Sequence, residues 1–369
     1  MARNRKRGRT VLVWTASLFV AVQLLASGLL DYCWPQIRFP KLYEQLTRFD
    51  TVADSVNVVF LGSSRTGCLI DEGAFNEVAR EVTGDSRVTG FNAFVPAGDP
   101  VLCERMLQRL LEHGARPRYA VIEVSPEGIT ERTAWLSMYV GWALRWDDAP
   151  TYLRDMAVTG NLVRYAGTRI IPLYVYRDQI RQQLAEGALA WWRGRGRAVS
   201  STFVPPFGLA TASPVFHAAD PSHREPPQAP ATKWDQRVAT ALALAPVDAR
   251  RTTTVSLEGV HRELRRYRAG GNAAAALDRL LKRCRSHGIE PILVCVPLSS
   301  GHRNCYDAEI EAAFQAYLAA LCQKHGCRYI DQRTMLPDHF FVDHHHAGPE
   351  GGLLYSQKMA LEVVGPMWK

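Results

Sequence analysis

"VNVVFLGSSRTG", residues Val56 to Gly67, begins as a run of β-branched and apolar residues and ends on a glycine, two serines and an arginine. The apolar part predicts a short buried strand that ends at Gly62. Because ligands bind at the carboxyl ends of the strands of an open parallel sheet, at least one hydroxyl of Ser63 and Ser64 would lie at that edge. Serines after a glycine also commonly cap the following helix. Both roles are open on this stretch alone.

On either side of this stretch, strand-like and helix-like runs alternate along the chain. The expected strands cover residues 87–95, 118–126, 290–297 and 327–333. The expected helices cover residues 73–84, 99–114, 272–288, 308–326 and 350–364. Such alternation is typical of a parallel sheet with helices on both faces. We therefore expect an α/β fold, a flavodoxin-like three-layer α/β/α arrangement with a mostly parallel sheet.

A large inserted segment, residues 129–270, interrupts this pattern and divides the α/β domain into residues 56–128 and 271–369. The insertion contains most of the tryptophans and a proline-rich stretch at 203–233. Proline-rich chain of this length predicts a long loop, so we expect the insertion to be partly helical with a proline-rich loop. An insertion of this size in an α/β domain usually forms a cap or a surface for a partner.

The N-terminal region predicts a membrane anchor. Residues 1–10 form a basic tail, and Val11–Leu30 is an uncharged apolar run of the length that a spanning helix needs. Basic residues before the run predict a single pass with a cytoplasmic N-terminus and an extracytoplasmic body, joined by a connector at 31–55. A cleaved signal peptide is the alternative. Five of the eight net positive charges lie in the tail, so little positive charge remains elsewhere for binding nucleic acid.

Near the other end of the chain, "DHHHAGPEG" places Asp343 three residues before His346. A serine is a weak nucleophile until an imidazole takes its proton, and a carboxylate is needed to orient that imidazole and to stabilise its charged form. One loop that carries both groups could activate Ser64. The sequence therefore suggests Ser64, His346 and Asp343 as a catalytic triad.

With these motifs in this order, the chain resembles the SGNH (GDSL-type) hydrolase and acyltransferase superfamily. "FLGSSRTG" matches the first conserved block of that family and makes Ser64 the nucleophile, although Ser63 stands where the family usually has Asp. The resemblance implies that the N–H of Gly98 helps to form the oxyanion hole and that Asn92 belongs to the same block. It places Asp343 and His346 in the fourth block. In the third block the chain has "IEVSPEG" and lacks the usual Asn oxyanion donor.

This departure directs the comparison to one branch of the superfamily. Membrane-anchored relatives that resemble this chain have a "GSSR" first block and a Ser-Pro after the third strand. They include the D-alanyl transfer protein of teichoic acids and the alginate O-acetylation proteins. The resemblance implies an extracytoplasmic body that works beside a multi-spanning membrane-bound O-acyltransferase. It also implies acyl transfer to, or removal from, an envelope polysaccharide, with no cofactor.

Two further features of the sequence invite other functions. His344, His345 and His346 are adjacent, but adjacent histidines rarely all face one ion and no second ligand cluster accompanies them, so we expect no metal site. We expect His344 and His345 to face solvent or to support the loop. Arg65 is a candidate for binding an anionic acceptor or carrier, with a surface ion pair as the alternative.

Two functions therefore remain open at the level of sequence. In the first, Ser64 attacks an ester or thioester carbonyl, and a sugar hydroxyl or water resolves the acyl-enzyme. In the second, the protein is a non-catalytic accessory that keeps the fold and binds a glycan or a membrane partner. The missing Asn of the third block favours the second. The presence of Ser64, Asp343 and His346 together favours the first.

Overall fold

A five-stranded sheet forms the centre of the molecule, and every strand pair in it is parallel, in the order β2-β1-β3-β4-β5. This computed structural model describes residues 2–131, 143–158, 160–192 and 257–368. The strands are β1 (Val58–Leu61), β2 (Gly90–Asn92), β3 (Tyr119–Glu123), β4 (Glu290–Cys295) and β5 (Arg328–Asp331). The expected α/β class with a parallel sheet is therefore confirmed, and the opening strand lies in the sheet's interior.

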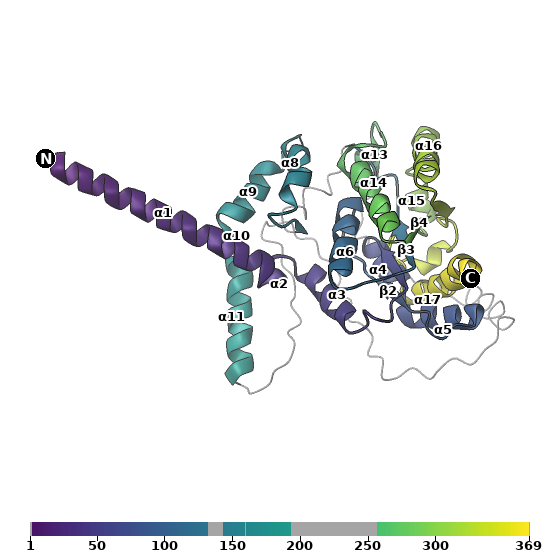
Figure 1. Cartoon of the computed structure of the whole chain (residues 1–369). Coiled ribbons are helices and arrows are strands. Elements are labelled where there is room, and N and C mark those ends of the chain that lie inside the picture. Colours follow the sequence, from purple (N-terminus) through teal and green to yellow (C-terminus); the bar gives the residue numbers. More distant parts are fainter. Residues whose placement is uncertain (1, 132–142, 159, 193–256, 369) are drawn as a thin grey trace.

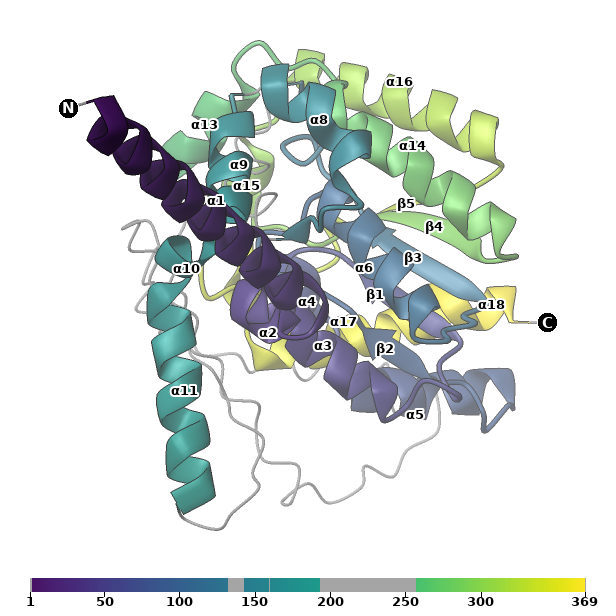
Figure 2. The ribbon, with the colours of Figure 1, turned by 60° about the vertical axis from the view of Figure 1, so that its left-hand side comes forward.

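Helices pack on both faces of the sheet because successive strand residues point to opposite sides. Val59 and Leu61 join one apolar cluster, and Val58 and Phe60 join the other. The first cluster is completed by α6 (Pro100–Glu112), α14 (Gly271–Ser286) and α16 (Ala308–His325). The second is completed by α5 (Glu72–Thr83), α17 (Pro349–Lys358), the π-helical segment η3 (Met359–Val364) and α18 (Gly365–Met367). Figure 2 shows β1, β3 and β4 between α14 and α17.

The helix ends follow signals that can be read in the sequence. Asp71, Asp99 and Asp307 cap α5, α6 and α16, and each side chain accepts a hydrogen bond from a backbone N–H of the first turn. Helices α5 and α16 end at Gly84 and Gly326, which adopt the left-handed conformation at the C-cap. These caps fix where each connection leaves the sheet.

The N-terminal helix α1 (Ala2–Tyr32) projects away from the body (Figure 1). Its part from Gly8 to Tyr32, 25 residues, is long and apolar enough to span a membrane, and no other helix of the described chain meets that criterion. The connector after it is helical, with α2 (Pro35–Arg38) and α3 (Pro40–Asp50). Phe49 of α3 is buried against Phe91 of β2, with 5.2 Å between ring centroids. The connector therefore belongs to the core.

The described part of the insertion is helical. It comprises α8 (Ala149–Val158), α9 (Leu162–Ile170), α10 (Pro172–Val175), α11 (Arg177–Trp192) and α13 (Leu257–Leu264). Helices α9 and α10 lie beside the C-terminal half of α1 in both views, and α11 extends away from it (Figures 1 and 2). The proline-rich stretch at 203–233 lies outside the described residues. The role of the insertion as a cap or a partner surface stays a prediction.

Candidate active site

Ser64 is the first residue of α4 (Ser64–Leu69), which follows β1 almost directly. The preceding residue, Ser63, caps this helix, and its Oγ accepts a hydrogen bond from the backbone N–H of Arg65 at 3.1 Å. The Oγ of Ser64 instead lies 2.7 Å from Nε2 of His346. The sequence left two roles open for these serines. In the structure Ser63 caps the helix, and Ser64 lies within hydrogen-bond distance of the His346 imidazole.

The loop before α17 brings His346 and Asp343 together. Oδ2 of Asp343 lies 2.7 Å from Nδ1 of His346, and its Oδ1 accepts the backbone N–H groups of His345 and His346 at 2.8 and 2.7 Å. A bridge between Phe341 and Ala347 closes the loop at its base. Because a carboxylate can only accept, Nδ1 of His346 carries the proton, and Nε2 is left to accept from the Ser64 hydroxyl. The three groups form one hydrogen-bonded chain.

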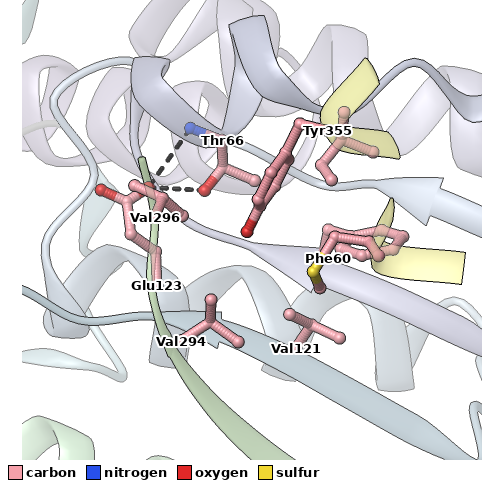
Figure 3. A pocket seen from close by; sticks show the side chains of 9 residues that line it. Phe60, Thr66, Val121, Glu123, Val294, Val296 and Tyr355 are labelled. Atoms are coloured by element: carbon pink, nitrogen blue, oxygen red, sulfur yellow. Dashed lines mark hydrogen bonds between the residues drawn. The ribbon is translucent and has the colours of Figure 1, made fainter. Parts of the chain in front are cut away.

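Glu123, the last residue of β3, accepts several hydrogen bonds from the turn that contains Ser63 and Ser64. Its carboxylate accepts from Ser63 N and Ser63 Oγ, both at 2.8 Å, and from Thr66 Oγ1 at 2.5 Å, as Figure 3 shows for Thr66. It also accepts from Nε of Arg65 at 2.8 Å. A Cβ at Gly62 would come within 2.4 Å of this carboxylate, so only glycine fits there. Glu123 therefore positions the turn that carries Ser64.

Arg65 is buried and its guanidinium is occupied on all sides. Besides the contact with Glu123, Nη1 lies 2.5 Å from Glu127 and Nη2 donates to Ser125 Oγ at 2.9 Å. Burial opposes the positive charge, but the two carboxylates raise the pKa of Arg65. The surface ion pair considered for Arg65 is thus a buried one. Its nitrogens bind neighbouring protein groups, so the structure does not place a free guanidinium at Ser64 for an anionic substrate.

The pKa of Glu127 gives the site an expected pH dependence. Burial alone would raise the pKa, but Arg65 and His302 hold it well below its ordinary value. The unfolded chain therefore takes up a proton before the folded one, and the stabilisation present above pH ~4.3 is lost as the pH falls through the folded pKa.

We expect the difference in unfolding free energy between wild type and Glu127→Gln to shrink below about pH 4. Urea unfolding between pH 7 and pH 3 measures it, with exposed Glu350→Gln as control. If the difference in unfolding free energy between wild type and Glu127→Gln stayed constant over this range, the lowered pKa of Glu127 would be contradicted.

The expected oxyanion donor, Gly98, is already bonded in this structure. Its N–H donates to the carbonyl of Val95 at 2.8 Å, which closes a four-residue turn. Ala97 in that turn has φ 53°, a conformation that is uncommon for a residue with a side chain. Among the described residues, the N–H groups of Ala97 and Ser64 donate no hydrogen bond. In the structure, Gly98 N is thus already bonded, whereas Ala97 N and Ser64 N are two donors of this region without a hydrogen bond.

Gly98 nevertheless has a packing role beside the turn that carries Ser64. A Cβ at this position would lie 2.6 Å from the carbonyl oxygen of Gly62 and 2.8 Å from that of Val95. Both are backbone atoms, so the backbone of the turn would have to move.

We expect Gly98→Ala to lower the unfolding free energy by about 1–3 kcal/mol in urea titrations. Gly259→Ala, where nothing lies within 4 Å, is the matched control. A Gly98→Ala protein as stable as this control would refute the close approach.

Asn92 is also engaged by the backbone. Its Nδ2 donates to the carbonyl oxygens of Ile70 at 2.9 Å and Thr66 at 3.3 Å, and its own N–H is bonded to Glu72 at 2.6 Å. These contacts tie β2 to the end of α4. The structure therefore gives Asn92 a positioning role for the helix that carries Ser64, and no contact with the Ser64–His346 pair.

The other two histidines of the loop support it in different ways. The carbonyl of His344 accepts from N and Oγ of Ser299 at 3.2 and 2.9 Å. Burial and the neighbouring His346 hold the pKa of His345 well below its ordinary value, which keeps this ring neutral at pH 7. Asp343, His345 and His346 also offer one potential ligand atom each within 4.8 Å of one another. An ion there would compete with the hydrogen bond between Asp343 and His346.

The cavity beneath the site is small. It is lined by Thr66, Glu123 and Tyr355 among others and has a volume of about 10 Å³ (Figure 3). This is the space of about one water molecule, so it cannot hold a substrate. Ser64 and His346 are partly exposed, with 18% of the His346 side chain accessible. A substrate would have to approach them from solvent.

Comparison with family models and with curated proteins identifies no relative of this chain, since no family model and no curated protein matches it.

Proposed function

We propose that the protein is a serine esterase or O-acyltransferase that works through Ser64, His346 and Asp343. The observation that carries this proposal is the hydrogen-bonded chain from Ser64 Oγ to His346 and on to Asp343, with 2.7 Å at each step. A serine, an imidazole and a buried carboxylate in this order are recognised as a triad by geometry and not by position in the sequence.

In the proposed reaction, Ser64 Oγ attacks the carbonyl carbon of an ester or thioester, and His346 Nε2 takes the hydroxyl proton. The proton then passes to the leaving oxygen or sulfur as the acyl-enzyme forms. A sugar hydroxyl or water attacks the acyl carbon and gives its proton to His346, which returns it to Ser64 Oγ as the bond between Oγ and the acyl group breaks. Asp343 stabilises the charged imidazole throughout. The N–H groups of Ser64 and Ala97 are the proposed donors to the oxyanion.

The setting of the reaction is the second part of the proposal. We propose that α1 anchors the protein as a single-pass helix with its basic tail in the cytoplasm and its body outside. The flavodoxin-like three-layer arrangement belongs to the proposed SGNH-like assignment. From the resemblance to membrane-anchored acyl-transfer proteins, we propose an envelope polysaccharide as acceptor and a multi-spanning O-acyltransferase as partner. No cofactor takes part in this scheme.

Trapping of the acyl-enzyme tests the proposed chemistry. The full chain in detergent is incubated with an activated aryl acetate, quenched in acid and digested. We expect a mass increase of one acetyl group on the peptide that contains Ser64, and none in Ser64→Ala. Acetylation spread over surface lysines with an unmodified Ser64 would contradict the proposal.

A non-catalytic accessory function is the second candidate, and one observation favours it. The chain lacks the third-block Asn, and the N–H of Gly98 is bonded to Val95, so two donors expected from the resemblance are missing. Loss of a single oxyanion donor can lower a rate by ~10²–10³. A folded protein that forms no acyl-enzyme but binds an envelope glycan would favour this alternative.

A further inference from the structure

Helix α1 carries a polar stripe within its apolar run. Gln23, Ser27 and Asp31 are spaced four residues apart, which places them on one face of the helix. All three side chains are buried. Between Val11 and Leu25, apolar side chains on the other faces of α1 are exposed, as at Leu18 and Leu25. The stripe is therefore covered by other parts of the chain, whereas the apolar faces of α1 before Ala26 are not.

The insertion and the connector provide this cover. Oε1 of Gln23 accepts the backbone N–H of Leu173, at the start of α10, at 3.3 Å. Ser27 Oγ accepts from Nη2 of Arg38 at 3.2 Å and from the indole of Trp146 at 3.0 Å.

Further along the stripe, Asp31 is bonded to Arg38 and to Arg169 of α9. The ends of α9 and α10 are thus bound along the last turns of α1.

The length of the apolar run fixes the depth of these contacts. The basic tail ends at Arg9, so the hydrocarbon begins near Val11, and about 20 residues are needed to cross its ~30 Å. The far boundary then falls near Leu30. Gln23 precedes Leu30 by seven positions, or about 10 Å along the helix. If the bilayer ended at Val22 instead, the span would be only about 18 Å, too short to cross.

The surface and backbone of α10 suit an apolar environment. Ile170, Leu173 and Tyr174 are exposed in the structure, Tyr174 by 66%. The N-terminal amides of α10 are satisfied, because its first residue is Pro172 and the N–H of Leu173 is bonded to Gln23. In hydrocarbon each unpaired backbone group would be costly. Among the exposed charges nearby, Arg177 and Arg181 have long stems that can reach the headgroups. The carboxylate of Asp178 lies 3.7 and 3.9 Å from these two guanidinium groups and is paired with them.

A cavity of about 300 Å³ lies at the same junction. Leu29 and Leu30 of α1, Ile37 of α2, and Ile180 and Leu184 of α11 contribute apolar walls. Gln36 and Gln183 also line the cavity. A hydrocarbon chain would contact the apolar walls.

We propose that the turn from α9 to α10 is embedded in the outer leaflet of the bilayer and that a lipid acyl chain fills the cavity beside α1. This inference rests on the membrane anchoring proposed above and is independent of the reaction at Ser64. The turn and cavity together would hold the body at a fixed height above the lipid surface, since α9 and α10 are bound to α1 at two levels.

Quenching by lipids tests the proposal on the full chain. Cysteines replace Leu18, Tyr174, Ile180 and Val82 one at a time in a background where the exposed and half-buried native cysteines are serine (Cys33, Cys68, Cys322 and Cys327). Each variant is labelled with bimane and reconstituted in phosphatidylcholine vesicles. Lipids with a doxyl group on the acyl chain are then added. We expect strong quenching at Leu18→Cys, Tyr174→Cys and Ile180→Cys, and little at Val82→Cys, which is exposed on α5.

The outcomes separate the anchor from the embedded turn. Quenching at Leu18→Cys with Tyr174→Cys and Ile180→Cys at the level of Val82→Cys would overturn the proposal and leave the anchor intact. Absence of quenching at Leu18→Cys would overturn the anchor and the proposal together. Quenching at Tyr174→Cys without Ile180→Cys would overturn the occupied cavity. None of these readouts depends on catalysis.

Discussion

His346→Ala is expected to lower the rate of aryl ester cleavage by ~10²–10⁴, the usual contribution of a positioned general base. The reason is local, because the imidazole is the group 2.7 Å from Ser64 Oγ and the hydroxyl is a weak nucleophile without it. Release of the aryl alcohol at saturating ester, measured with purified full chain in detergent, gives the effect on kcat.

Two companion variants make this result specific. His339→Ala removes an exposed histidine from the segment just before the loop and should leave kcat unchanged. Asp343→Asn should lower kcat, because the amide cannot orient the imidazole and stabilise its charge as the carboxylate does. Equal rates in wild type and His346→Ala would remove the imidazole from the reaction.

Glu123→Ala is expected to lower the unfolding free energy by about 3–5 kcal/mol, the usual result of removing one partner of a buried ion pair. Arg65 would keep Glu127 but lose the carboxylate 2.8 Å from its Nε. The backbone N–H of Ser63 would lose its acceptor as well. Urea unfolding of the full chain in detergent measures the change.

Glu123→Gln and Glu290→Ala are the controls for this effect. Glu290 is exposed at the start of β4, and its substitution should change the unfolding free energy by no more than about 0.5 kcal/mol. Glu123→Gln keeps the shape of the side chain and one oxygen acceptor, so we expect a smaller loss of stability with a slower reaction at Ser64. If Glu123→Ala were as stable as Glu290→Ala, Glu123 would not hold the turn.

The fold was readable from the sequence where local signals were strong. The β-branched run before Gly62 and the alternation after it predict the strands and helices that the structure contains, because burial on both faces of a parallel strand leaves a continuous apolar run. Asp99 and Asp307 mark helix starts that the structure also has. The sequence also placed Ser64 and Asp343–His346 at strand and helix ends that the structure brings together.

The sequence could not show which polar groups would be bonded to one another. Glu123 and Glu127 look like ordinary acidic residues after a strand, and only the folded chain places them around Arg65. The hydrogen bond from the Gly98 N–H to the carbonyl of Val95 could not be predicted from the sequence either. It depends on the turn in which Ala97 adopts a positive φ. A signal existed for Glu123, since a carboxylate that ends a buried strand beside a serine turn is expected to find donors.

Labelling of the purified full chain with a fluorophosphonate probe is the most direct test of the central claim, an activated Ser64. We predict covalent labelling of wild type at Ser64, none in Ser64→Ala, and labelling of wild type that persists in EDTA because hydrogen bonds from Asp343 hold His346 in place. A folded wild type that stays unlabelled, or a Ser64→Ala protein labelled to the same extent, would contradict the account.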